Sequence, residues 1–151
     1  MTTRIITEPT VEPLVLADVK VHLREDLTSA GNDALITTLI QVARQAAEHR
    51  LQRALMLQTL EQTLDAFPVA TDTNPLAAIV LEMPPVVDVT SVTYTDAAGA
   101  TIVLASTEYT LDAAREPAQL VPSYAAGSWP ATQGSIAAVR VRYRAGYSTS
   151  A

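Results

Sequence analysis

The sequence contains no cysteine, two histidines, one phenylalanine and one tryptophan. Without cysteine the chain has no disulfide framework, no thiolate zinc site and no cysteine nucleophile. The histidines, His22 and His49, are far apart, and each stands among charged residues of an expected helix. That setting favours a solvated surface histidine over a metal ligand or a general base. The lack of cysteine and the small number of histidines therefore argue against most metal sites and against nucleophilic catalysis by cysteine.

Long apolar runs and basic residues are scarce as well. No stretch approaches the roughly 18 consecutive apolar residues that a bilayer-spanning helix needs, and the N-terminus lacks the apolar core of a signal peptide. The chain has 10 Lys and Arg against 16 Asp and Glu, a formal net charge of −6. Binding to nucleic acid or to an anionic membrane rests largely on positive charge. We therefore expect a soluble, non-exported protein that contacts no membrane and is a poor general nucleic-acid binder.

Signatures of catalysis are absent too. The sequence has no P-loop, no dinucleotide fingerprint and no nucleophile elbow. Its sixteen acidic residues are scattered, without the spacing of a glycosidase pair or a magnesium cluster. We expect no catalytic residue, no cofactor and no metal, and hence a protein that is not an enzyme.

The 151 residues predict one domain whose first part, about 14–53, is helical. A short helix is expected from Leu16 to Glu25, and a longer one from Asn32, a good N-cap, to about Leu51. Arg44 and Glu48 belong to the polar side of the longer helix. Its periodicity predicts an apolar face that packs on the chain's own sheet, although three alanines in that face would also let another backbone approach. The apolar set is Leu35, Ile36, Leu39, Ile40, Ala43, Ala46, Ala47 and Leu51.

The second part, about 56–147, has strand-like patterns. The clearest is a hairpin, in which Val86–Thr95 turns at Asp96 to Gly99 and pairs with Ala100–Leu104. The order of two helices followed by about seven short strands predicts an α+β fold, the helices packed with a mainly antiparallel sheet region. The other expected strands are Gln58–Asp65, Ala77–Glu82, Tyr109–Leu111, Gln119–Val121 and Ala137–Ala145.

The last strand carries three arginines at alternate positions, Arg140, Arg142 and Arg144. Alternate residues of a strand share one face, so Val139, Val141 and Tyr143 should point to the other. The cationic row is typical of a solvated face. It also suits an acidic neighbour or a nucleic-acid phosphate, and the row alone leaves these readings open.

Trp129 lies in the longest loop, from Pro122 to Ser135, with Tyr124 and Tyr147 as possible neighbours. A large aromatic residue in a loop is most often buried against the body of the domain. An aromatic loop can also be a binding hot spot. The alternative function that follows is a small β-rich module binding carbohydrate or protein through this loop.

Several segments together resemble the head–tail connector (adaptor, head-completion) proteins of tailed phages, prophages and gene-transfer particles. The resemblance covers nearly the whole chain. No single motif is specific, but the ordered set is moderately so. It rests on residues 16–24 before the alanine-rich helix, 84–94 followed by Asp96 and Gly99, 120–122 with 128–130, and the final Ala145-Gly146-Tyr147.

This resemblance implies a structural virion protein at the head–tail interface, assembled in the host bacterial cytoplasm. Its family forms a ring of about twelve subunits beneath the portal, which extends the DNA channel and supports the next tail component. The implied partners are other copies of the chain, the portal protein and a downstream stopper or tail-completion protein, with double-stranded DNA only as passing cargo. We hypothesise a subunit or portal interface formed by Arg140, Arg142, Arg144, Arg44, Glu48 and Trp129.

The sequence departs from that family at two places. Val15 stands where many relatives have Ser or Thr as the cap of the first helix. Relatives usually continue past the Ala-Gly-Tyr strand into another helix, whereas this sequence stops at Ala151. The chain is either a shorter member or lacks that segment, so portal contacts of such a helix are not assigned to it.

Overall fold

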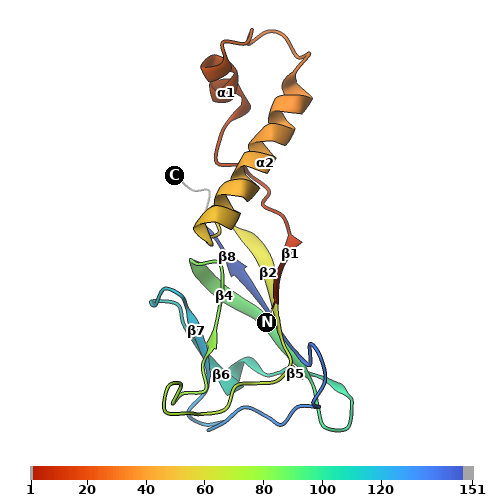
Figure 1. The fold of residues 1–151 in the computed structure, drawn as a ribbon, viewed down its shortest axis with the longest axis vertical. Coiled ribbons are helices and arrows are strands. Elements are labelled where there is room, and N and C mark those ends of the chain that lie inside the picture. Colours follow the sequence, from red (N-terminus) through yellow and green to blue (C-terminus); the bar gives the residue numbers. More distant parts are fainter. Residues whose placement is uncertain (1, 148–151) are drawn as a thin grey trace.

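We describe residues 2–147 of a computed structural model of the chain, an elongated molecule with helices at one end and two sheets at the other (Figure 1). The α+β class expected from the sequence is confirmed. The elements are β1 (Thr2–Thr7), α1 (Leu16–Leu23), α2 (Asp33–Leu51), β2 (Gln58–Leu64), β3 (Ile79–Val80), β4 (Val86–Thr95), β5 (Thr101–Leu104), η1 (Ser106–Glu108), β6 (Tyr109–Asp112), β7 (Gln119–Pro122) and β8 (Val139–Ala145).

The strands form two antiparallel sheets, one of five strands in the order β1-β2-β8-β4-β5 and one of three in the order β3-β7-β6. β8 is the central strand of the larger sheet, and its residues are alternately buried and exposed, as the period of two predicts. Tyr143 points inward and donates its hydroxyl to the carbonyl of Glu82 at 2.8 Å. The hydrophobic core lies between the sheets and includes Leu60, Val92, Val139 and Val141 with Ile79 and Leu120.

The predicted helices and strands lie where the structure has them, with differences at their ends; the last strand, for example, begins at Val139 rather than Ala137. The structure adds β1, which pairs with β2 along the edge of the larger sheet, in a segment for which the sequence predicted no strand. β3 is limited to Ile79–Val80 instead of Ala77–Glu82, because Ala77 and Met83 have positive φ angles that end the extended backbone. The first helix ends at Leu23 rather than Glu25, since Arg24 is its left-handed C-cap.

The apolar face of α2 does not pack on the sheet as expected, and only the last turns of the helix adjoin the sheet, where Glu48 binds Gln58 of β2. α2 and α1 form an arm that projects beyond the sheets (Figure 1), and α1 is the main element that α2 contacts. Only four residues of α2 are buried, at successive intervals of four: Ile36, Ile40, Arg44 and Glu48. Periodicity identified an apolar stripe, but it could not show whether the chain's own sheet lies against it. Neither helix of residues 2–147 combines the length and hydropathy that crossing a membrane requires.

Candidate functional site

The arm exposes an unusually apolar surface. Leu35, Leu39 and Val42 of α2 are 59%, 53% and 53% exposed, and their spacing places them on one side of the helix. Other exposed apolar side chains lie on α1 and on the segments around both helices. Protein–protein contacts are commonly built on exposed apolar surface of this kind. The exposed set of the arm is Val11, Leu14, Val15, Val21, Leu23, Leu27, Leu35, Leu39, Val42 and Leu51, which we call the arm surface.

Arg44 fixes the arm to the N-terminal segment. Its side chain is 2% exposed, and its guanidinium donates to Glu12 at 2.8 Å, to Glu48 at 2.8 Å and to Glu8 at 3.0 Å. Burial alone would lower the pKa of Arg44, but the hydrogen bonds to Glu12 and Glu8 outweigh it and raise the pKa. We call the segment with Glu8 and Glu12 the strap, because it crosses α2 at this arginine.

Glu48 extends the same network into the body. Its Oε2 binds Arg44, while its Oε1 accepts hydrogen bonds from the backbone N–H of Leu55 at 2.7 Å and from the Gln58 amide at 3.1 Å. One buried carboxylate therefore links the last turns of α2, the connection to the body and the first residue of β2. Arg44 and Glu48, expected at an interface, are engaged inside the chain, and another subunit would reach them only after the strap moved.

Two residues of the arginine row form ion pairs within the sheet. Arg142 donates to Glu61 at 2.8 Å, and Arg4 of β1 binds the other oxygen of the same carboxylate at 2.6 Å. Burial alone would raise the pKa of Glu61, but the two arginines lower it overall. Arg144 donates from Nε to Asp88 at 3.0 Å and lowers the pKa of that carboxyl group. The acidic neighbour foreseen as one reading of the row is thus present in the chain itself.

Arg140 differs from the other two arginines. It is exposed, and its register partners across β2 and β4 are Thr63 and Thr93, which carry no charge. Among residues 2–147 no ion pair or hydrogen bond of its side chain is found. Arg140 is therefore the member of the row that remains free for a partner.

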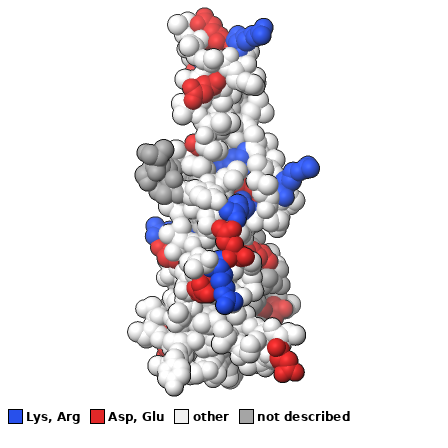
Figure 2. Space-filling model, turned by 90° about the vertical axis from the view of Figure 1, so that its left-hand side faces the viewer, with Lys and Arg blue, Asp and Glu red and all other residues white. Residues whose placement is uncertain are grey.

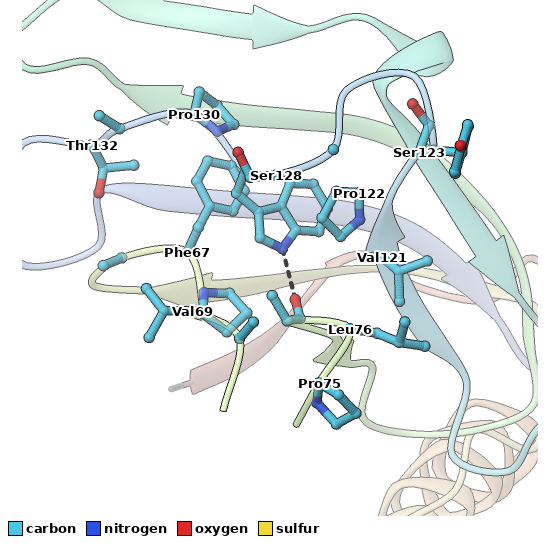
Figure 3. Close-up of a pocket in the computed structure, with 18 residues that line it drawn as sticks. Phe67, Val69, Pro75, Leu76, Val121, Pro122, Ser123, Ser128, Pro130 and Thr132 are labelled. Atoms are coloured by element: carbon cyan, nitrogen blue, oxygen red, sulfur yellow. Dashed lines mark hydrogen bonds between the residues drawn. The ribbon is translucent and has the colours of Figure 1, made fainter. Parts of the chain in front are cut away.

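Trp129 is packed against the body of the domain, as was expected for a large aromatic residue in a loop. Its indole N–H donates to the carbonyl of Ala77 at 2.7 Å, and its ring stacks on Phe67 with centroids 4.7 Å apart (Figure 3). Trp129 and Tyr124 both line one pocket among the loops of the body. Tyr147 does not, because it lies at the base of the arm, where Arg53 donates to its hydroxyl.

Sequence reasoning missed the strap and the exposure of the arm surface. Nothing local connects Glu8 or Glu12 with Arg44, which is more than thirty residues away, so no spacing rule could find the cluster. Leu35, Leu39 and Leu51 were identified as apolar positions of α2, but with the wrong environment, and Val42 was not among the residues identified. Within the described residues, no group of three or more histidine and acidic side chains is placed to hold a metal ion.

No family model matches the sequence, and no curated protein matches it. Solved structures do match. A chain in the neck of an empty gene transfer agent particle, described with C6 symmetry, gives a TM-score of 0.71 at 24% identity, covering 99% of this chain and 73% of that one. A chain in the virion of a native particle gives 0.70 at 24% identity, covering 99% and 74%. A chain in the neck of a native particle, described with C12 symmetry, gives 0.61 at 24% identity, covering 99% and 72%.

The arm and the two-sheet body together define one fold, since each match covers 99% of this chain. That fold is the one found in these neck and virion chains of gene transfer agent particles. The likeness in three dimensions is thus to chains of gene transfer agent particles, one of the particle types to which the sequence resemblance pointed.

Proposed function

We propose that this chain is a structural subunit of a virion neck, a head–tail connector that forms a ring of about twelve copies beneath the portal. The ring extends the DNA channel and provides the platform for the next tail component. The observation that carries the proposal is the fold match over 99% of the chain to chains of gene transfer agent particles. Two of the matched necks are described with C6 and C12 symmetry, which supports repeated copies around an axis.

The arm surface supplies the contact that a ring needs. A cyclic ring uses heterologous contacts, in which one face of each subunit meets a different face of the next. Leu35, Leu39 and Val42 are more than half exposed, and burying such a side chain contributes roughly 1.5–3 kcal/mol. We therefore assign the arm surface to the contact with the neighbouring copy, and Arg140 to a polar contact with the neighbour or the portal.

The charge distribution suits DNA as passing cargo. The net charge is −6, and ion pairs with Glu61 and Asp88 offset the charges of Arg142 and Arg144. A ring of such subunits repels the phosphate backbone over much of its surface. A lumen lined by Arg140, Arg142 and Arg144 in an assembled particle would contradict this part of the proposal.

Charges placed on the arm surface test the proposal. In a producing strain that lacks the gene, we expect the wild-type gene to restore tailed particles, and the double variant Leu35→Glu/Leu39→Glu to give at least about 10-fold fewer, because two buried carboxylates would disrupt the contact. Particles are counted by negative-stain electron microscopy.

The matched control is Gln41→Glu/Gln45→Glu, which adds the same charge to other exposed positions of α2. It should restore tails like the wild type. Both double variants should keep the wild-type melting temperature, since all four side chains are exposed in the isolated chain. Normal particle numbers with the leucine variant would contradict the assignment of the arm surface.

A further inference from the structure

An open apolar pocket lies among loops of the body (Figure 3). These loops are at the end of the body farthest from the arm (Figure 1). The volume of the pocket is about 820 Å³. The walls come from the loop after β2 and from the loop between β7 and β8. We call this pocket the basin; it is lined by residues 66–70, 75–77, 121–124 and 127–132.

The walls of the basin are preformed. Trp129 is fixed on one side by its hydrogen bond to Ala77 and on the other by Phe67, which is only 8% exposed. Phe67 in turn packs edge-on against Tyr94 of β4, with centroids 5.6 Å apart. Binding of a ligand would therefore cost little entropy for ordering the side chains of the pocket floor.

The rim of the basin is exposed and apolar. Tyr124 is fully exposed, Val69 is 74% exposed and Leu76 is 59% exposed. Exposed apolar side chains around a preformed pocket are typical of a docking site for another molecule. Tyrosine in particular presents a large contact area with few rotatable bonds.

The lining contains no charged residue; its polar side chains are Ser123, Ser128, Thr132 and Tyr124, together with Trp129, whose indole N–H is already bonded to Ala77. Four prolines, Pro68, Pro75, Pro122 and Pro130, contribute no backbone N–H donors. Sugars need several polar partners for their hydroxyl groups, so the lining disfavours carbohydrate. Aromatic and proline-rich walls suit an extended apolar peptide, as in grooves that bind polyproline-type segments.

The surroundings of the basin are acidic. Asp65 and Asp72 adjoin its lining segments, and the backbone of Glu108 bonds Ser123 in its wall. All three are exposed, and none has an ion pair among the described residues. The sequence has no Lys or Arg between Arg53 and Arg140 except Arg115, which pairs with Asp112. On the face drawn in Figure 2, the end farthest from the arm likewise shows red and white but no blue.

We propose that the basin binds an extended apolar segment of another protein, flanked by Lys or Arg. The apolar part enters between Trp129 and Tyr124, and the basic flanks face Asp65, Asp72 and Glu108. The apolar floor provides the contact area, and the acidic rim selects the charge of the partner. This inference concerns the isolated chain and does not depend on ring formation.

The single tryptophan makes binding directly measurable. We would titrate the protein with acetylated and amidated peptides that have centres of Pro, Leu and Val and two lysines at each end, following Trp129 emission and confirming the affinity by calorimetry. The same peptides with glutamates at the ends are the comparison. We expect saturable binding of at least one lysine-flanked peptide, at least about 10-fold tighter than its glutamate-flanked counterpart at low salt, with the difference shrinking as salt rises.

Two variants tie the signal to the basin. Tyr124→Ala should weaken binding roughly 5- to 10-fold without changing stability, because that side chain is fully exposed. Val103→Ala, an exposed apolar position on β5 outside the basin lining, should have no effect. Equal affinity for both peptide charges, no binding by any peptide of the panel, or a response to maltoheptaose instead would each overturn the proposal.

Discussion

Replacing Gly146 with alanine is expected to destabilise the folded chain severely. The residue has a φ of +112°, which L side chains rarely adopt, and a Cβ there would lie 2.1 Å from the carbonyl oxygen of Met56. Its N–H also donates to the carbonyl of Pro85 at 2.9 Å, so the segment is held from both sides. The clash is with backbone and has no flexible side chain to relieve it. We expect a loss of more than about 4 kcal/mol in the free energy of unfolding, measured by urea denaturation.

Gly127→Ala is the matched control for that variant. Gly127 also has a positive φ, +72°, but a Cβ there would meet no atom within 4 Å. Gly127→Ala therefore measures only the cost of placing a Cβ on a residue with positive φ, which is about 1–2 kcal/mol. If Gly146→Ala cost no more than Gly127→Ala, the close approach of the β8 end to Met56 would not be a determinant of this fold.

Removing the guanidinium of Arg44 is the second large effect. Arg44→Met leaves the buried carboxylate of Glu48, and those of Glu8 and Glu12, without their shared cation. Breaking a buried ion pair from one side costs about 3–5 kcal/mol. The loss should fall on the junction between arm and body, so the helical signal in circular dichroism should melt before the emission of Trp129, which reports on the far end of the body.

Arg144→Met is the matched control, because its ion pair with Asp88 is about half exposed, with 47% and 42% exposure of the two side chains. An exposed pair contributes little to stability, because solvent screens it. Equal destabilisation by the two variants, or coincident melting of the two signals in Arg44→Met, would contradict the role of Arg44 in holding the arm.

Elements with a local signal were predictable from the sequence. The Val86–Thr95 hairpin has a turn residue, Asp96, whose carboxylate accepts the N–H groups of Ala98 and Ala100, and this geometry is a property of aspartate in turns. The alternation of inward and outward side chains in β8, and the ends of α2, likewise follow from neighbouring residues in the sequence. Each of these features depends on residues that are close in the chain.

Features that depend on distant segments were not predictable. The buried side of α2 carries two charged residues, Arg44 and Glu48. The strap supplies Glu8 and Glu12 to Arg44, and Gln58 at the start of β2 binds Glu48. An amphipathic pattern identifies an apolar stripe but not the element that packs against it. The prediction that this stripe of α2 packs on the sheet was therefore wrong. The basin likewise joins segments some sixty residues apart, from Ala66 to Trp129, and only the fold places them together.

Assembly with the portal is the most direct test of the account. We would measure the mass of the protein by size-exclusion chromatography with light scattering, alone and mixed with the portal protein from the same genome. The account predicts a ring with a mass about twelve times that of the chain, or a complex of such rings with the portal. A protein that stays monomeric and does not bind the portal would contradict the connector function, while leaving peptide binding at the basin to be judged on its own result.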